Sequence, residues 1–306
     1  VRNKKVSLRG ALVRDMMKDM METAMGHRFQ TGAVRKNPRE PVWICPEGCE
    51  YEIVDMDEFR MEYLHPAGIA TGRVILQLHG GGYIGPMKNI YRDFAKLYSR
   101  YSMGADVLTV DYRVAPEDPF PTAVLESYRV AAYAFEHARE LGIDPARIIL
   151  AGHSAGANLA ATVCMRAGET RAFRPAGLIM DYPPLDVYTD PAAKPREEGD
   201  SAPEDANIYN ASYCQKGEGK NPYASPVFAD LSMLKQFPET LMITCQLDKL
   251  CKEGERFASM LVEAGITVTC RRFVNSLHGF TVSRTDEWEG AMELIHRFIR
   301  QRLEHI

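Results

Sequence analysis

The sequence predicts an α/β fold in which a mostly parallel β-sheet is covered by helices on both faces. After Gly72, short apolar runs rich in β-branched residues alternate with longer segments whose apolar residues recur at helical spacing. Strands that are joined by helical crossovers form parallel sheets. The strand-like runs are 73–78, 106–112, 147–151, 177–182, 240–245 and 266–274, and the helical segments are 88–101, 121–140, 155–167, 252–264 and 286–304.

Three regions depart from this alternation. Residues 41–65 alternate apolar and polar side chains, which predicts an antiparallel start to the sheet. Residues 184–225 contain no strand-like run and are rich in proline, glycine and charged residues, so we expect a lid or a substrate-facing cap there. Residues 8–26 predict an amphipathic helix with a methionine-rich face that includes Met16 and Met20, and such an adaptable face packs on a core or lines a pocket.

Composition and charge exclude several classes of protein. The 306 residues are 45% hydrophobic and 25% charged, which is ordinary for a soluble globular protein of one large domain or two. The net charge of −4 gives no reason to expect a nucleic acid or an acidic membrane as partner. Charged residues interrupt the first thirty positions, so we expect no signal peptide, no membrane span and a cytoplasmic location. The seven scattered cysteines predict reduced thiols, and Cys45 and Cys49 lack the further Cys or His pair that a zinc site needs, so we expect no metal.

A G-x-S-x-G pattern lies between a buried strand and an alanine-rich helix, at Gly152-His153-Ser154-Ala155-Gly156. At a sharp strand-to-helix turn the serine adopts a strained backbone conformation that exposes its Oγ. The glycines are needed because strand and helix nearly touch there. A Gly/Ser turn without chemistry is the alternative, but the flanking strand and helix favour a nucleophilic serine.

Other chemically active residues follow neighbouring strands. Three glycines, preceded by His79, follow strand 73–78, while Asp248 follows strand 240–245 and His278 follows strand 266–274. Ligands bind at the carboxyl ends of parallel strands. We therefore expect Ser154 to be the nucleophile, His278 its general base, and Asp248 the carboxylate that orients the imidazole.

The tetrahedral intermediate of acyl transfer needs fixed hydrogen-bond donors for its oxyanion. Consecutive glycines allow backbone N–H groups to turn into a cavity. We expect these donors to be the N–H groups of Gly81, Gly82 and Ala155.

Other residues compete for the catalytic roles. His153 is adjacent to Ser154, but neighbouring side chains on a tight turn point apart, and His79 is expected to fix the glycine loop by hydrogen bonding. Asp181 and Asp186 follow strand 177–182 and remain alternatives for the acid. Asp248 is favoured because its strand lies next to the one that delivers the histidine.

Four motifs in one order resemble the hormone-sensitive-lipase-like esterases, which are also called bacterial family IV carboxylesterases. They are His79-Gly80-Gly81-Gly82-Tyr83, residues 111–117 (DYRVAPE), residues 152–156 (GHSAG) and residues 278–280 (HGF). The resemblance runs from about residue 60 to the C-terminus. It implies an α/β-hydrolase fold and hydrolysis of small-molecule carboxylic esters, usually with short acyl chains, without cofactor or metal.

The same resemblance implies a helical cap built from N-terminal helices (1–45) and the insertion (184–225) over a core of residues 46–183 and 226–306. On this basis we expect the substrate to contact Tyr83, Met16, Met20 and Tyr188. Whether the chain forms a homodimer stays an open question.

Two positions differ from the family pattern. His153 stands where the family usually has Asp or Glu, and Lys249 follows Asp248 where the family usually has proline. These differences affect the loops around the site, so substrate preference does not transfer directly. Amide, carbamate or lactone hydrolysis and acyl transfer remain alternatives, and a non-catalytic small-molecule receptor is disfavoured because all three expected catalytic residues are present.

Overall fold

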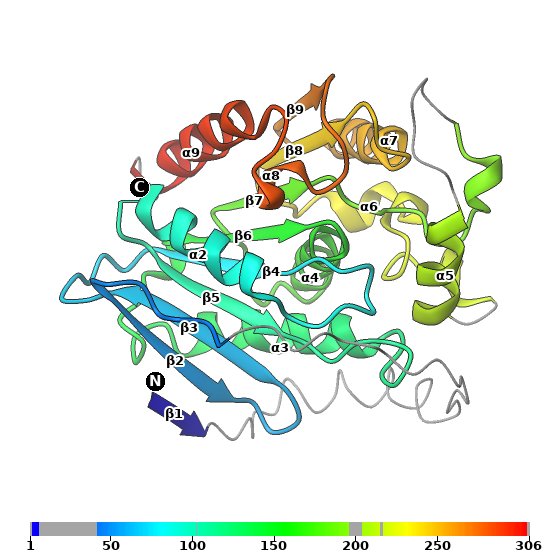
Figure 1. The fold of residues 1–306 in the computed structure, drawn as a ribbon. Coiled ribbons are helices and arrows are strands. Elements are labelled where there is room, and N and C mark those ends of the chain that lie inside the picture. Colours follow the sequence, from blue (N-terminus) through cyan, green and yellow to red (C-terminus); the bar gives the residue numbers. More distant parts are fainter. Residues whose placement is uncertain (1, 6–41, 102, 196–203, 215–216, 305–306) are drawn as a thin grey trace.

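A nine-stranded sheet forms the centre of the molecule, with strand order β1-β2-β3-β5-β4-β6-β7-β8-β9 (Figure 1). This computed structural model describes residues 2–5, 42–101, 103–195, 204–214 and 217–304. The strands are β1 (Arg2–Lys5), β2 (Cys49–Asp55), β3 (Arg60–Pro66), β4 (Val74–Leu78), β5 (Asp106–Asp111), β6 (Ile148–His153), β7 (Gly177–Asp181), β8 (Thr240–Cys245) and β9 (Val268–Phe273).

The sheet is parallel from β5 through β9 and antiparallel at the β2–β3 hairpin. Strands β2 and β3 pair antiparallel, as do β3 and β5, whereas every neighbouring pair from β5 to β9 is parallel. Both the antiparallel start and the parallel remainder of the sheet are therefore confirmed.

Helices cover both faces of the sheet (Figure 1). Alternate side chains of a strand point to opposite faces: Leu76 and Leu150 belong to the apolar cluster that includes α3, α4, α6 and α7, whereas Ile75 and Ile149 belong to the one that includes α2, α8 and α9. The predicted α/β fold class is confirmed. The helices are α2 (Asn89–Tyr101), α3 (Thr122–Glu136), α4 (Ala155–Thr170), α5 (Glu204–Tyr213), α6 (Leu231–Leu234), α7 (Cys251–Glu263), α8 (Phe280–Ser283) and α9 (Trp288–Glu304), with short 3₁₀ turns at Pro145–Arg147, Pro191–Ala193, Glu218–Lys220 and Pro226–Phe228.

Some element boundaries differ from the predicted ones. Helix α3 ends at Glu136 rather than at 140. Strand β9 begins at Val268 rather than at 266, because Gly265 adopts a φ of +88° and the N–H of Ile266 bonds back to the preceding helix. The insertion contains α5, which the residue pattern did not predict, although the resemblance implied a helical cap. Its alternation of polar and small residues gives no clear apolar stripe.

The N-terminal region is only partly described. Residues 6–41, which include the predicted methionine-rich helix with Met16 and Met20, lie outside the described residues. Arg2–Lys5 form β1, which pairs parallel with β2 from Glu52 to Asp55, where we expected helices. A strand of four polar residues is held by backbone hydrogen bonds, which side-chain patterns do not encode.

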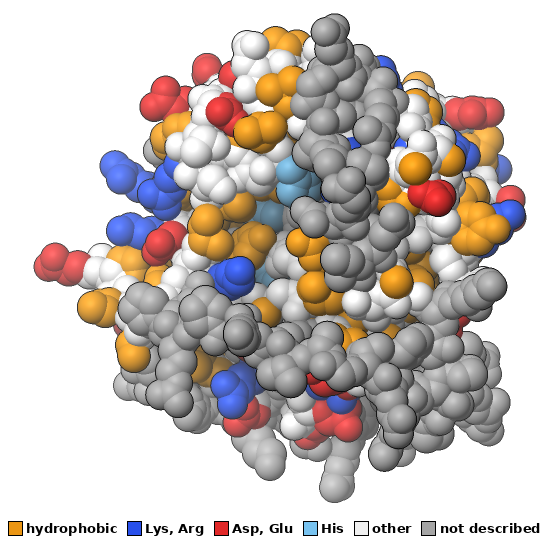
Figure 2. Space-filling view, turned by 45° about the vertical axis from the view of Figure 1, so that its right-hand side comes forward, with side chains coloured by type: hydrophobic (Ala, Val, Ile, Leu, Met, Phe, Trp, Pro, Cys, Tyr) orange, Lys and Arg blue, Asp and Glu red, His pale blue; other side chains and the backbone are white. Residues whose placement is uncertain are grey.

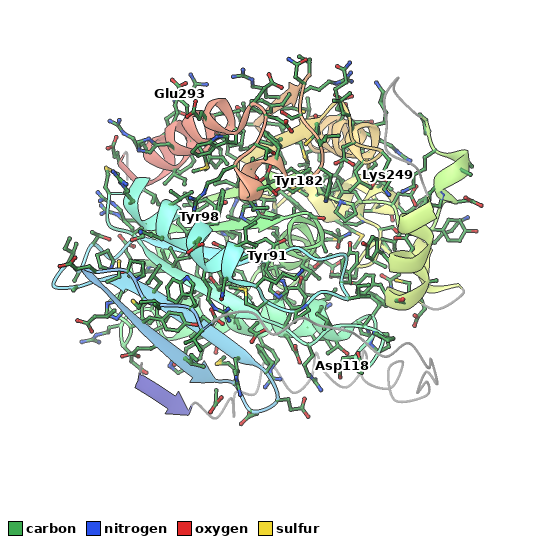
Figure 3. All side chains as sticks on the ribbon, in the orientation of Figure 1. Tyr91, Tyr98, Asp118, Tyr182, Lys249 and Glu293 are labelled. Carbon is green, nitrogen blue, oxygen red and sulfur yellow. The ribbon has the colours of Figure 1, made fainter. Side chains whose placement is uncertain are left out.

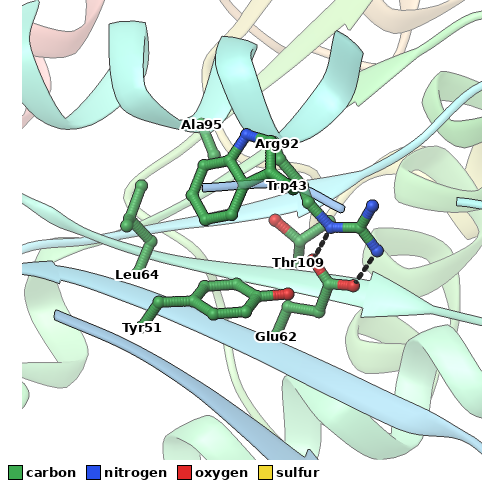
Figure 4. A pocket seen from close by; sticks show the side chains of 7 residues that line it. All are labelled: Trp43, Tyr51, Glu62, Leu64, Arg92, Ala95 and Thr109. Carbon is green, nitrogen blue, oxygen red and sulfur yellow. Dashed lines mark hydrogen bonds and ion pairs between the residues drawn. The ribbon is translucent and has the colours of Figure 1, made fainter. Parts of the chain in front are cut away.

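Helix α2 is tied to the antiparallel hairpin by a buried ion pair. Arg92 donates two hydrogen bonds to the carboxylate of Glu62 on β3, at 2.8 and 2.5 Å, beside a small pocket lined by Trp43 and Tyr51 (Figure 4). Bidentate guanidinium–carboxylate contacts fix orientation as well as supply energy. The pair therefore holds in place the helix that contributes Tyr91 and Tyr98 to the environment of the site.

The described helices include none with the length and apolar character needed to cross a bilayer. In the same residues, no three His, Cys, Asp or Glu side chains gather as metal ligands would. All seven cysteines are free thiols.

Candidate active site

Ser154 lies at the turn between β6 and α4 in a strained conformation, with φ 52° and ψ −122°. A non-glycine residue with positive φ persists only where its surroundings fix it. The turn is tight enough that a Cβ at Gly152 would lie 2.2 Å from the carbonyl oxygen of Gly156, and a Cβ at Gly156 would lie 2.1 Å from that of Leu78. The close approach of strand and helix that the motif predicted is present.

A continuous row of hydrogen bonds joins the three residues that the sequence proposed. His278 Nε2 lies 2.8 Å from Ser154 Oγ, and its Nδ1 lies 2.6 Å from Asp248 Oδ2. Because a carboxylate only accepts, Nδ1–H donates to Asp248, which leaves Nε2 to accept the serine proton. Asp248 is 1% exposed, and its other oxygen accepts the N–H of Leu250 at 3.0 Å, so the buried carboxylate is held in one orientation.

The electrostatic surroundings favour the protonated form of His278. Burial lowers the pKa of this imidazole, but the charge of Asp248 and its hydrogen bond outweigh burial and raise the pKa above its usual value. The His278 side chain is 38% exposed, so it is accessible from outside. The ring of Tyr182 packs against it at 4.8 Å between centroids.

His79 fixes the glycine loop, as expected. Its side chain is fully buried, and Nδ1–H donates to the carbonyl of Gly80 at 2.7 Å. The ring stacks on Tyr112 at 4.1 Å, and the Tyr112 hydroxyl donates to the His79 carbonyl at 2.7 Å. Burial lowers the pKa of His79 to about 4, so the ring is neutral near pH 7.

The glycine loop turns its backbone sharply beside Ser154. Gly81 and Gly82 have φ values of 128° and 61°, and Gly85 N–H bonds to the Gly81 carbonyl at 2.8 Å. Within the described residues, the N–H groups of Gly81, Gly82 and Ala155 donate to no backbone acceptor outside the helices and strands. Their role as oxyanion donors stays a prediction.

Helix α5 of the insertion packs on this loop through two tyrosines one turn apart. A Cβ at Gly82 would lie 2.7 Å from the ring of Tyr209, and Tyr213 stacks on Tyr83 at 3.7 Å with ring planes 7° apart. Tyr83 is 2% exposed, so we infer that it supports the loop, in place of the direct substrate contact that we expected. The sequence analysis missed Tyr209, because a helix without an apolar stripe gives no signal of how it docks.

Tyr188 packs within the insertion and its neighbouring segment. Its ring lies 4.7 Å from Lys220 Nζ and meets the edge of Phe228 at 5.9 Å. The substrate contacts expected of Tyr188, Met16 and Met20 stay predictions, and the two methionines lie outside the described residues.

The alternative acids bond elsewhere. Asp181 Oδ2 accepts from His153 Nδ1 at 3.0 Å, and Asp186 Oδ1 accepts the N–H groups of Tyr188 and Thr189. His153 thus points toward Asp181 and away from the row of hydrogen bonds at Ser154. The geometry favours Asp248 as the partner of the base.

On the molecular surface, histidine side chains are visible in a recess bordered by hydrophobic side chains (Figure 2). A recess of this kind suits a small ligand with an apolar part that reaches an imidazole.

Comparisons with known proteins show the family of the chain. The profile of a family with the alpha/beta hydrolase fold matches residues 75–282. An arylesterase of Saccharolobus solfataricus is 30% identical over 73% of this chain and 73% of its own, and the esterase LipI of Mycobacterium tuberculosis is 27% identical over 69% and 66%. Human hormone-sensitive lipase is 36% identical over 40% of this chain, which corresponds to 11% of its own length.

A solved structure shares most of the fold. The thermostable esterase of Pseudomonas putida has a TM-score of 0.76 at 26% identity, with 84% of each chain covered. The chain therefore belongs to the hormone-sensitive-lipase-like esterases of the α/β-hydrolase fold.

Proposed function

We propose that the chain is a serine carboxylesterase that cleaves short-chain esters of small molecules through an acyl-enzyme, with Ser154, His278 and Asp248 as its catalytic triad. The observation that carries this proposal is the unbroken row of hydrogen bonds from Ser154 Oγ through His278 to Asp248, at 2.8 and 2.6 Å. A serine hydroxyl is a weak nucleophile until a positioned base takes its proton, and this row provides the base and its orienting carboxylate.

In the acylation step, Ser154 Oγ attacks the ester carbonyl carbon while its proton passes to His278 Nε2. The carbonyl oxygen becomes an oxyanion and accepts hydrogen bonds from the N–H groups of Gly81, Gly82 and Ala155. Asp248 stabilises the imidazolium that forms. The intermediate then collapses, the bond to the alkoxy oxygen breaks, and His278 donates its proton to the leaving alcohol.

Deacylation repeats these roles with water. His278, neutral again, takes a proton from a water molecule, whose oxygen attacks the acyl carbon. The second oxyanion occupies the same amides. Its collapse releases the acid as Ser154 Oγ recovers the proton from His278. No step requires a cofactor.

The expected preference for short acyl chains has support in the way the insertion covers the glycine loop. The ring of Tyr209 contacts Gly82, and α5 is anchored by the stack of Tyr213 on Tyr83, so the space above the oxyanion amides is bounded. Each methylene that enters an apolar pocket contributes about 0.8 kcal/mol until the pocket is full. Activity is then highest for about two to eight acyl carbons and falls beyond roughly ten.

The seven free thiols support a cytoplasmic location, because disulfides are rare in reducing compartments. Whether the chain forms a homodimer is decided by light scattering on the purified protein.

A panel of p-nitrophenyl esters from acetate to palmitate tests the proposed function. We expect turnover with a burst of one p-nitrophenol per chain when acylation outpaces deacylation. Labelling by a fluorophosphonate without turnover of any ester in the panel would point to amide, carbamate or lactone hydrolysis. The absence of both labelling and turnover would contradict the proposal.

A further inference from the structure

A second histidine–aspartate pair lies directly behind the nucleophile turn. His153 and Asp181 are the last residues of β6 and β7, stand opposite each other in the sheet, and are both fully buried. Their Nδ1 and Oδ2 atoms are 3.0 Å apart. The carboxylate only accepts, so the imidazole donates Nδ1–H.

Asp181 also holds the backbone of the nucleophile. Its carbonyl oxygen accepts the N–H of Ser154 at 2.8 Å. The positive φ of Ser154 is maintained only if neighbouring contacts fix it. Asp181 thus restrains the turn twice, through the amide of Ser154 and through the side chain of His153.

The same carboxylate reaches the segment that carries the base. Thr281, three residues after His278, donates its hydroxyl to Asp181 Oδ2. Since this proton is used, the Tyr182 hydroxyl donates to Thr281 Oγ1, at 2.7 Å. Tyr182 is labelled beside α8 in Figure 3, and its ring packs on the His278 imidazole at 4.8 Å. One buried network therefore connects the serine turn to the base.

Apolar packing encloses the pair from the side of α2. The His153 ring meets the edge of Phe94 at 4.5 Å and lies 5.9 Å from Tyr91 and from Tyr98. Within the described residues, His153 Nε2 and Asp181 Oδ1 have no hydrogen-bond partner. A buried polar pair that leaves two atoms unpartnered stabilises a fold less than apolar side chains of similar volume, so its position behind the reacting serine calls for another role.

Charge provides a second link to the base. Burial lowers the pKa of His278, Asp248 raises it most strongly, Asp181 raises it further, and Lys249 lowers it. The titratable or charged groups around His278 come from the nucleophile turn, from β7, from the loop after β8 and from its own loop: Ser154, Asp181, Tyr182, Asp248, Lys249 and Asp286.

We propose that Asp181 is a positioning residue for the reaction: it fixes Ser154 and the His278 segment relative to each other, and its charge stabilises the imidazolium that forms during attack. This inference rests on the proposed esterase function. It assigns a task to the His153–Asp181 pair, which takes no part in proton transfer.

Asp181→Asn tests the charge while it keeps the shape and an acceptor oxygen. We expect kcat to fall about tenfold with KM within about twofold of the wild type, because the error is in alignment and not in ground-state binding. The acid limb of kcat/KM should move to lower pH. A merely structural role would leave that limb unchanged.

Asp106→Asn is the matched control. Asp106 on β5 is a partly buried carboxylate that accepts a hydrogen bond from Tyr63 at 2.5 Å, and it is not among the groups with the largest effect on the pKa of His278. Asp106→Asn should perturb a buried hydrogen bond to a comparable extent. Its pH profile should remain that of the wild type. NMR titration of the His278 imidazole in wild type and Asp181→Asn reports the same shift without any turnover.

Thr281→Val keeps the inference testable if Asp181→Asn does not fold. It removes the link to the base but retains the Asp181 charge, so kcat should fall about tenfold with an unchanged acid limb. Two outcomes with an active wild type would overturn this inference and leave the proposed function in place. One is a His278 titration in Asp181→Asn that superimposes on the wild-type titration. The other is a kcat of Thr281→Val within twofold of the wild-type value. An inactive wild type would instead overturn the proposed function, and the NMR titration would still decide whether Asp181 acts on His278.

Discussion

Gly156 touches the backbone of His79: a Cβ on Gly156 would lie only 2.4 Å from the His79 carbonyl oxygen. Gly156 belongs to the helix that follows the nucleophile, and His79 begins the glycine loop. The contact therefore makes the serine and the loop amides parts of one rigid unit. Rigid placement of donors relative to the nucleophile is what stabilisation of an oxyanion requires.

We predict that Gly156→Ala lowers the free energy of unfolding by about 1–3 kcal/mol and the activity more than tenfold, because the added methyl group pushes backbone atoms apart. Urea unfolding and ester turnover measure the two effects. Gly290→Ala in α9 is the matched control, since its Cβ would lie 3.7 Å from the Phe273 ring. At that position the substitution should raise the free energy of unfolding by up to about 1 kcal/mol, because alanine has a higher helix propensity than glycine. Equal effects at the two positions would contradict the close contact.

Asp248→Asn should lower kcat by about 10²- to 10⁴-fold, because an amide stabilises the wrong tautomer of His278. Steady-state kinetics with a p-nitrophenyl ester measures the loss. Asp186→Asn provides the comparison: Asp186 follows the neighbouring strand but bonds the amides of Tyr188 and Thr189. A larger loss from Asp186→Asn would show that the acid is assigned to the wrong strand end.

The pH profile should follow the titration of His278. Catalysis needs the neutral imidazole, so kcat/KM rises with pH through the pKa of the free enzyme. Asp248 raises that pKa against the effect of burial. The midpoint of the acid limb should therefore lie above about 6.5, the usual value of histidine. A midpoint clearly below that value, or a rate independent of pH between 5 and 9, would argue against this base.

The sequence predicted the parts of the site that depend on strand ends. Ser154, Asp248 and His278 each follow a predicted strand, and parallel strands bring their carboxyl ends together. The Tyr209 contact and the link from Asp181 to Thr281 were not predicted. The first depends on how a helix without an apolar stripe docks, and the second on hydrogen bonds between residues that are 100 positions apart. Local patterns carry neither kind of information.

Tyr209 should limit acyl-chain length. Because its ring rests on Gly82, Tyr209→Ala is expected to open space above the oxyanion amides and to raise kcat/KM for octanoate relative to butyrate by several-fold, at about 0.8 kcal/mol for each methylene accommodated. Tyr188→Ala serves as the comparison, since Tyr188 packs on Lys220 and Phe228. A change of chain-length preference in Tyr188→Ala but not in Tyr209→Ala would assign the wall of the pocket to the other tyrosine.

The most direct measurement is the site of covalent modification by a fluorophosphonate, found by peptide mass spectrometry on the intact chain and on Ser154→Ala. Ser154 lies 2.8 Å from its base, and replacing it removes one oxygen without creating a cavity. We predict a single adduct on Ser154 in the wild type, none in the folded variant, and a loss of ester turnover of about 10⁴-fold or more. An adduct on another serine, or substantial turnover by Ser154→Ala, would contradict the assignment of the nucleophile.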